Sequence, residues 1–157
     1  STSFHVLEFT VNILFLTVAV FRDTYSDTII PIGKYYYCYT DTIRNFGMVI
    51  ARETGKILGI NQNDEVLFEV VKYDDGPDYV ENGLFRILKN NKYGYANVNG
   101  EVSIEPKFDC AHPFFMGKAQ VSDSCTIKTS NGQKVFLSNS WYYIDINGNR
   151  VKNGAPQ

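Results

Sequence analysis

Histidine is scarce in this 157-residue chain, which contains only His5 and His112. A serine-type catalytic triad needs a histidine beside its nucleophile, and structural zinc sites use several His or Cys ligands, so neither has enough material here. A Gly-x-Ser-x-Gly elbow, a phosphate-binding glycine loop and a dinucleotide-binding fingerprint are also missing from the sequence. We therefore expect no catalytic residue, no metal and no cofactor.

Charge of one sign is not in excess either, because 15 Lys and Arg stand against 17 Asp and Glu and no basic run occurs. A receptor for nucleic acid or for an anionic membrane needs such a basic patch, so we expect neither partner. Glycine and proline, at 12 and 5 residues, are close to average, while aromatics make up 15% of the chain. This composition excludes disorder and a fibrous fold, and the length fits one soluble domain or a small array of repeats.

Cysteine is limited to Cys38, Cys110 and Cys125, which are too few and too widely spaced for a disulfide-dense scaffold. We expect buried free thiols that act as small apolar side chains. A bridge between Cys110 and Cys125 is the alternative, and an oxidising compartment would favour it.

Long hydrophobic runs are absent, and the most apolar stretch extends only from Val11 to Phe21. A membrane helix needs roughly twenty such residues, so we expect no membrane span. No basic residue precedes the stretch and no small-residue cleavage site follows it before Arg22, which makes it a poor secretory signal as it stands. Removal of a signal peptide upstream stays open, as does the choice between a cytoplasmic location and export to the cell envelope. The β-branched and aromatic residues of the stretch favour strands over a buried helix.

Glycine follows asparagine at five of its twelve positions, and this dipeptide supplies the two positive φ angles of a two-residue hairpin. The clearest hairpin joins residues 93–98 to residues 101–105, and a second joins residues 141–146 to residues 149–151. Pro106 has no amide hydrogen to donate, so the returning strand of the first hairpin should end there. The dipeptides are Asn82-Gly83, Asn99-Gly100, Asn131-Gly132, Asn147-Gly148 and Asn153-Gly154, and further strand candidates cover residues 66–71, 84–87, 118–121 and 134–137.

The sequence repeats itself. Lys72-Tyr73-Asp74 recurs thirty-five residues later as Lys107-Phe108-Asp109, and Tyr95–Gly100 aligns with Tyr143–Gly148 at an offset of forty-eight. An earlier copy runs from Ile30 to Val49. Units of this length cannot bury their apolar faces alone, so they must stack on one another.

These patterns predict an all-β fold of antiparallel β-hairpin repeats, stacked or curled into one core, with barrel-like or propeller-like arrays as variants. About three units form a repeat domain over residues 30–151. Residues 1–29 form an apolar segment that we expect to pack on the array as strands, and residues 152–157 form a tail.

The run from Lys92 to Val121 resembles the WG repeat, also called the KWG repeat. It contains the aromatic-glycine pair Tyr93-Gly94, the Asn99-Gly100 turn, Phe108-Asp109, the pair Pro113-Phe114 and a closing Ala-x-Val. The resemblance extends over about residues 30–151, and at Trp141 the following glycine is replaced by tyrosine. It implies a bacterial repeat protein without an agreed enzymatic activity that binds other molecules.

Two groups of acidic residues are candidates for a calcium site or for acid-base catalysis. Asp74, Asp75 and Asp78 lack the spacing of a helix-loop-helix calcium site, so we expect them to build a turn. Glu101 and Glu105, together with Glu69, offer the paired carboxylates of a glycoside hydrolase. A solvent-facing row of charges is the more common role of such residues on a hairpin, and we favour it here.

Consecutive aromatic residues form three groups, at residues 35–37, 114–115 and 141–143, and they are the strongest indication of a binding surface. Successive strand residues point to opposite faces, so one ring of each group should face outward unless a second layer covers it, and most other rings should fill the spaces between hairpins. We predict a non-catalytic recognition module that binds a protein or a cell-surface glycan. The alternatives are a glycoside or peptidoglycan hydrolase that uses surface carboxylates, and a purely structural spacer. The candidate surface comprises Tyr36, Tyr37, Phe114, Phe115, Trp141 and Tyr143.

Overall fold

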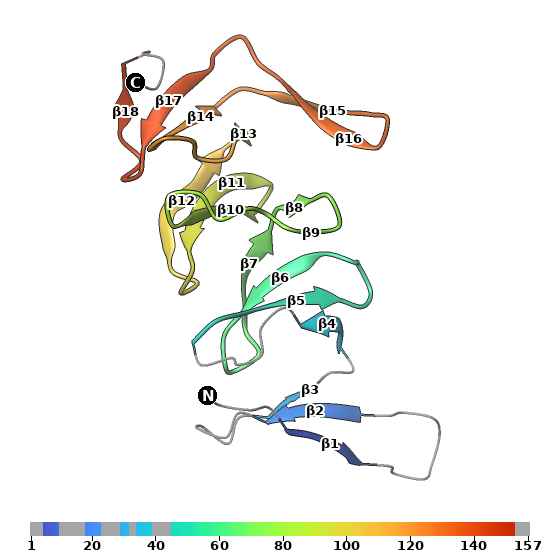
Figure 1. The fold of residues 1–157 in the computed structure, drawn as a ribbon. Coiled ribbons are helices and arrows are strands. Elements are labelled where there is room, and N and C mark those ends of the chain that lie inside the picture. The colour runs from blue at the N-terminus through green and yellow to red at the C-terminus, as the bar shows by residue number, and fades with distance from the viewer. Residues whose placement is uncertain (1–4, 10–17, 23–28, 32–33, 39–44, 153–157) are drawn as a thin grey trace. The chain divides into compact units, whose positions relative to one another are not determined.

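The computed structural model describes residues 5–9, 18–22, 29–31, 34–38 and 45–152, with side chains for residues 34, 35 and 45–152. The chain divides into two compact units, Ser1–Lys72 and Tyr73–Gln157. All regular elements of the described residues are antiparallel strands, and none of their sheets closes on itself (Figure 1). The predicted all-β antiparallel class is therefore confirmed, without the barrel-like closure. No helix long and apolar enough to cross a membrane occurs among the residues described.

The first unit contains two antiparallel groups of strands. Its N-terminal sheet consists of β1 (His5–Phe9), β2 (Val18–Arg22) and β3 (Ile29–Pro31). The second group runs in the order β4 (Tyr35–Cys38), β5 (Gly47–Ala51), β6 (Ile57–Ile60) and β7 (Val66–Val70). Its buried side chains include Tyr35, Val49, Ile57, Ile60, Phe68 and Val70.

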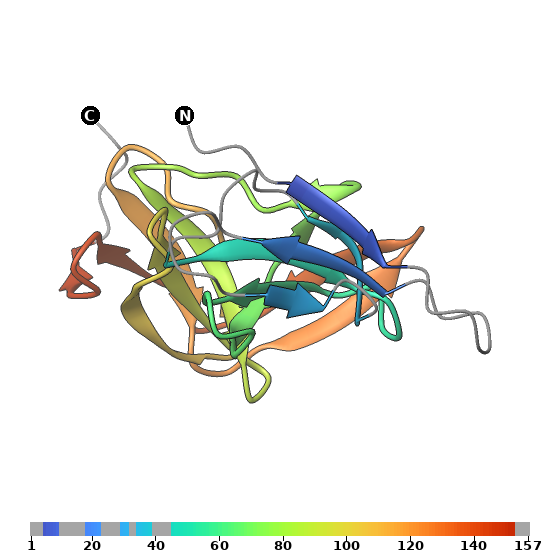
Figure 2. The ribbon, with the colours of Figure 1, turned by 90° about the horizontal axis from the view of Figure 1, so that it is seen from below.

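The second unit holds three groups of strands after the small hairpin of β8 (Lys72–Tyr73) and β9 (Gly76–Pro77) at the boundary. The first group is β10 (Leu84–Lys89), β11 (Lys92–Asn97) and β12 (Val102–Phe108). The second has the order β13 (Cys110–Ala111), β14 (Lys118–Ser122), β17 (Tyr142–Asp145) and β18 (Arg150–Val151). The third is the hairpin of β15 (Thr126–Ser130) and β16 (Gln133–Leu137), which extends away from the β13–β14–β17–β18 sheet (Figure 1, Figure 2).

One antiparallel pair recurs three times, as β5–β6, β10–β11 and β14–β17. In each pair the second residue of the WG motif faces an apolar partner: Gly59 faces Met48, Gly94 faces Ile87, and Tyr142 faces Val121. The connection between the paired strands changes from residues 52–56, to Asn90-Asn91, to residues 123–141. The β15–β16 hairpin is therefore an insertion into the connection of the third pair.

Each of the three pairs is followed by a loop of the same kind. The side-chain oxygen Oδ1 of Asn97 accepts the amide hydrogens of Asn99 and Glu101, and Asn61 and Asp145 accept the amides two and four residues later in the same way. Such local hydrogen bonds hold the backbone in a turn without help from tertiary packing.

These loops correct one prediction. At Asn99-Gly100 and Asn147-Gly148 only the glycine has a positive φ, of 80° and 81°, so the loops contain three residues rather than two. The two-residue hairpin with both angles positive occurs at Asn82-Gly83 and Asn131-Gly132. Asn153-Gly154 lies outside the described residues.

The predicted stop at Pro106 is wrong, because β12 continues to Phe108. Tyr93 pairs with Phe108 and Tyr95 pairs with Ile104, so β12 carries extra residues opposite Gly94 and forms a bulge. At a bulge the ladder is locally interrupted, and a proline without an amide hydrogen is tolerated there.

The prediction of free thiols is also wrong for two cysteines, because Cys110 and Cys125 form a disulfide. The register places buried Cys110 opposite Ser122, and the chain turns back to Cys125 three residues later. The bond ties the first residues of the inserted hairpin to β13. The hydroxyl of Ser122 adds hydrogen-bond contacts at 2.7 and 3.2 Å with the hydroxyls of Ser138 and Ser140, where the insertion returns. The side chain of Cys38 lies outside the described residues.

Candidate functional site

A buried row of side chains crosses the β10–β11–β12 sheet of the second unit. Arg86 pairs with Tyr95, and Tyr95 pairs with Ile104, so the three residues share one face. Asp78 joins the end of this row: the Nε and Nη2 atoms of Arg86 donate to its carboxylate oxygens at 2.8 and 2.6 Å. All four residues are buried, and we call them the covered row.

The charges in the covered row are fully compensated. Besides the two guanidinium contacts, the Asp78 carboxylate accepts the backbone amide of Arg86 at 2.9 Å. Burying an ion pair is tolerated only when its remaining hydrogen-bonding groups find partners. Within the part of the chain that the structure describes, no buried side-chain nitrogen or oxygen lacks a partner. Asp78, which the sequence placed in an acidic turn, is thus an internal structural residue.

The segment Ala111–Phe114 covers this row. The carbonyl oxygen of Ala111 accepts a hydrogen bond from Nη1 of Arg86 at 3.1 Å, and the carbonyl of His112 accepts one from the Tyr95 hydroxyl at 2.7 Å. The Phe114 ring lies edge-on to the Tyr95 ring, with centroids 4.7 Å apart. Burial raises the pKa of the Tyr95 phenol, which therefore remains a hydrogen-bond donor.

The next repeat can be aligned with this one through its turns. Asn82-Gly83 and Met116-Gly117 both have positive φ at each position and close equivalent bridges, Glu81 to Leu84 and Phe115 to Lys118. The Gly117 amide donates to Oδ1 of Asn82 at 3.1 Å, so the two turns are in direct contact.

With this alignment every residue of the covered row has a counterpart. The counterparts of Arg86 and Asp78 lie thirty-four positions later, and those of Tyr95 and Ile104 follow from the strand pairing. Gln120 replaces Arg86, and His112 replaces Asp78. Gln120 pairs with Tyr143 and Tyr143 pairs with Val151, as Arg86 pairs with Tyr95 and Tyr95 with Ile104. We call His112, Gln120, Tyr143 and Val151 the terminal row.

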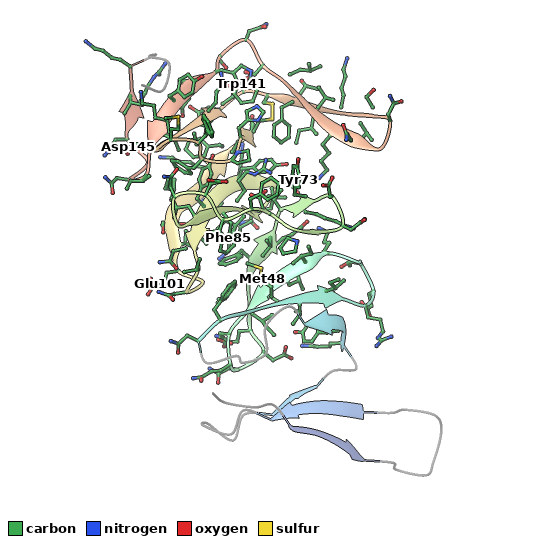
Figure 3. The ribbon with its side chains drawn as sticks, viewed as in Figure 1. Met48, Tyr73, Phe85, Glu101, Trp141 and Asp145 are labelled. Atoms are coloured by element: carbon green, nitrogen blue, oxygen red, sulfur yellow. A yellow bond between two sulfur atoms is a disulfide. The ribbon has the colours of Figure 1, made fainter. Side chains whose placement is uncertain are left out.

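The terminal row differs from the covered row because its four side chains are all partly exposed. Trp141 lies at its His112 end, with ring centroids 5.0 Å apart, and the ring of Phe136 in the inserted hairpin also lies 5.5 Å from that of His112. Trp141, labelled in Figure 3, immediately precedes β17. Strand alternation places Tyr143 on the same side of the chain as Trp141. Among the described residues, the Gln120 amide and the Tyr143 hydroxyl have no hydrogen-bond partner.

The side chains of the terminal row carry no charge at neutral pH. Burial lowers the pKa of His112 from its ordinary value of 6.5, and the nearby Arg86 charge lowers it further. The imidazole is therefore uncharged at neutral pH. On the opposite face of β17, Tyr142 donates its hydroxyl to the Asp123 carboxylate at 2.9 Å and lies under the Arg150 guanidinium at 4.4 Å. Burial and the Asp123 hydrogen bond raise the pKa of Tyr142 to about 12.

The six aromatic residues predicted as a binding surface have different fates. Phe114 is buried, with 1% exposure, so it belongs to the core rather than to the surface. Phe115 is 64% exposed at the turn before β14. Trp141 and Tyr143 are partly exposed and lie beside the terminal row. Tyr36 and Tyr37 belong to β4, and their side chains are outside the described residues.

Sequence reasoning missed Gln120 and gave His112 no binding role. Both could have been found by aligning Gly83 with Gly117, because that alignment places them opposite Arg86 and Asp78. The two residues are polar, and periodicity alone did not separate them from ordinary surface positions.

The carboxylates of the hydrolase alternative occupy exposed or half-exposed positions. Oε2 of Glu101 accepts a hydrogen bond from the Asn97 amide at 2.7 Å, and Glu105 is exposed on β12. Glu69, in the first unit, forms an ion pair with Lys56 at 2.7 Å. In the described part of the chain no three His, Cys, Asp or Glu side chains gather in a way that could hold a metal ion.

Taken together, these observations define an antiparallel β-repeat protein in which the first two of three recurring pairs contain an aromatic or aliphatic residue before a glycine. Residues 60–93 and 93–123 match the family described as WG containing repeat. The resemblance seen in the sequence is confirmed for these two adjacent repeats, so the chain contains WG repeats. No curated protein and no solved structure matches the chain.

Proposed function

We propose that the chain is a non-catalytic recognition module that binds a protein partner through the terminal row and the adjoining Trp141. One observation supports this proposal above others. The covered row, which has the same strand positions, already binds a polypeptide segment of this chain through two side-chain donors and one aromatic ring. The terminal row presents donors and rings at the same positions and is partly exposed.

The composition of the surface fits this role. Trp and Tyr are enriched where proteins bind one another, because they combine a large apolar area with a hydrogen-bonding atom. The neutral His112 and Gln120 can be buried by a partner without leaving a charge unpaired. A glycan ligand would use the same rings for stacking, and the experiment below separates the two ligand classes.

The test is a comparison of purified wild-type chain with two variants. Trp141→Ala removes the ring at the end of the terminal row, and Ile146→Ser changes an exposed apolar residue, 47% accessible, in the loop after β17. Each protein is immobilised, exposed to an extract of the source cells and to a glycan array, and its folding is checked by circular dichroism. We expect proteins captured by the wild type and by Ile146→Ser to be lost with Trp141→Ala. Equal capture by all three chains contradicts the proposal, and binding confined to the glycan array replaces the protein ligand with a sugar.

A further inference from the structure

We infer that the terminal row binds an extended peptide segment of the type x-x-Pro-aromatic. This inference rests on the proposed function and specifies its ligand. The molecule contains its own template for such a complex, because Ala111-His112-Pro113-Phe114 lies on the covered row.

The terminal row has a hydrogen-bond donor at each position where the covered row has one. On the covered row, Arg86 and Tyr95 donate to the carbonyls of two successive residues, Ala111 and His112. On the terminal row, Gln120 and Tyr143 occupy these positions, and an amide and a phenol are both neutral donors. Two such donors are matched by two successive carbonyls of a peptide that adopts the backbone conformation of residues 111–112.

The covered row contains a charged pair and the terminal row contains neutral polar groups, and this difference agrees with their exposure. Arg86 is buried and needs the Asp78 carboxylate to compensate its charge. Gln120 and His112 replace the charged pair with neutral groups that are stable in a partly exposed surface. A ligand that covers them therefore buries polar groups without having to supply a counter-charge.

The aromatic position of the ligand follows from the Tyr95 contact. Phe114 packs edge-on against Tyr95, and Tyr143 stands at the corresponding place in the terminal row. A proline before this aromatic residue, as in Pro113-Phe114, restricts the free ligand to extended conformations and lowers the entropy lost on binding.

The experiment uses the full chain and a peptide with the sequence of Asp109–Met116 in which serine replaces Cys110. Trp141 is the one tryptophan of the chain, so its fluorescence reports directly on the site. We expect saturable binding with a dissociation constant on the order of 100 µM, as two hydrogen bonds, one ring contact and burial of the phenylalanine side chain together imply. A peptide with alanine in place of Phe114 should bind about ten-fold more weakly.

Two conservative variants of the chain test the donors. Tyr143→Phe removes only the hydroxyl, and Gln120→Leu removes only the amide, and each should weaken the peptide about five-fold, as loss of one neutral hydrogen bond implies. The control variant Ile146→Ser should bind like the wild type. Tyr95→Phe should also leave the peptide affinity unchanged, because the chain itself occupies the covered row.

The outcomes separate this inference from the proposed function. Absence of saturable binding up to about 2 mM peptide, well beyond the expected constant, or equal binding by Tyr143→Phe and the wild type, overturns the peptide chemistry. If Trp141→Ala still abolishes protein capture in that case, the recognition role stands with a different ligand. If capture is unaffected as well, both proposals fail.

Discussion

Gly94 and Pro106 face each other across the β11–β12 pair at a separation that leaves no space for a side chain. A Cβ atom on Gly94 would lie 2.7 Å from the Pro106 nitrogen and 2.6 Å from the Ile104 carbonyl oxygen. Both neighbours are backbone atoms, which cannot move aside as a side chain would. The glycine of the WG motif is therefore required here by the bulge of the neighbouring strand.

Gly94→Ala should lower the free energy of unfolding by about 1–3 kcal/mol, the usual cost of overpacking. Gly76→Ala is the matched control, because no atom lies within 4 Å of its added Cβ, and it should change stability by less than about 0.5 kcal/mol. Urea unfolding followed by Trp141 fluorescence measures both. Equal stability of the two variants would show that the bulge yields to the methyl group.

The Asp78–Arg86 pair should behave as a buried pair in which each partner needs the other. Asp78→Ala or Arg86→Ala alone should destabilise the second unit by about 3–5 kcal/mol, because the remaining charge is left buried. The double variant Asp78→Leu with Arg86→Met should cost less than either single change. A double variant whose loss equals the sum of the single losses would contradict the coupling.

The disulfide should stabilise the base of the inserted hairpin. Replacing both Cys110 and Cys125 by serine should cost about 3 kcal/mol, as expected for a closed loop of fifteen residues. Amide exchange should accelerate most in β15 and β16, the strands that the bond ties to β13. Exchange that accelerates evenly over the second unit would mean that the bond does not restrain the hairpin specifically.

The lowered pKa of His112 should make the folded chain less stable in mild acid. Its pKa is lowered in the folded chain, so the unfolded chain binds more protons below about pH 6.5. The stabilising contribution is complete above that pH and is lost as the pH falls toward the lower folded value. His112→Gln should flatten the stability profile between pH 7 and 5 relative to the wild type. A wild-type His112 resonance that titrates at or above pH 6.5 would refute the assignment.

The sequence predicted the fold class, the main strands and the repeat family, because hydrophobic alternation and turn dipeptides act locally. It failed where an outcome depended on contacts between strands. The sequence predicts a strand end at Pro106 because the bulge opposite Gly94 is not visible in β12 alone. The thiols of Cys110 and Cys125 were assigned as free because only the register with Ser122 brings them together.

The surface proposed from the structure differs in part from the one predicted from the sequence, for the same reason. Aromatic pairs identify rings, but they do not say which ring the next repeat covers, so Phe114 was placed outside although it packs on Tyr95. Trp141 and Tyr143 are partly exposed and stay predicted residues of the binding surface. Gln120 gained meaning only when its position was compared with that of Arg86.

The most direct test of the account is a nuclear magnetic resonance titration of the isotope-labelled chain with the Asp109–Met116 peptide that carries serine in place of Cys110. The account predicts that the largest amide shifts occur at Gln120, Tyr143 and Val151, with contacts between the peptide phenylalanine and the Tyr143 ring. Shifts centred elsewhere, or no shifts at millimolar peptide, would show that the terminal row is not a polypeptide-binding surface.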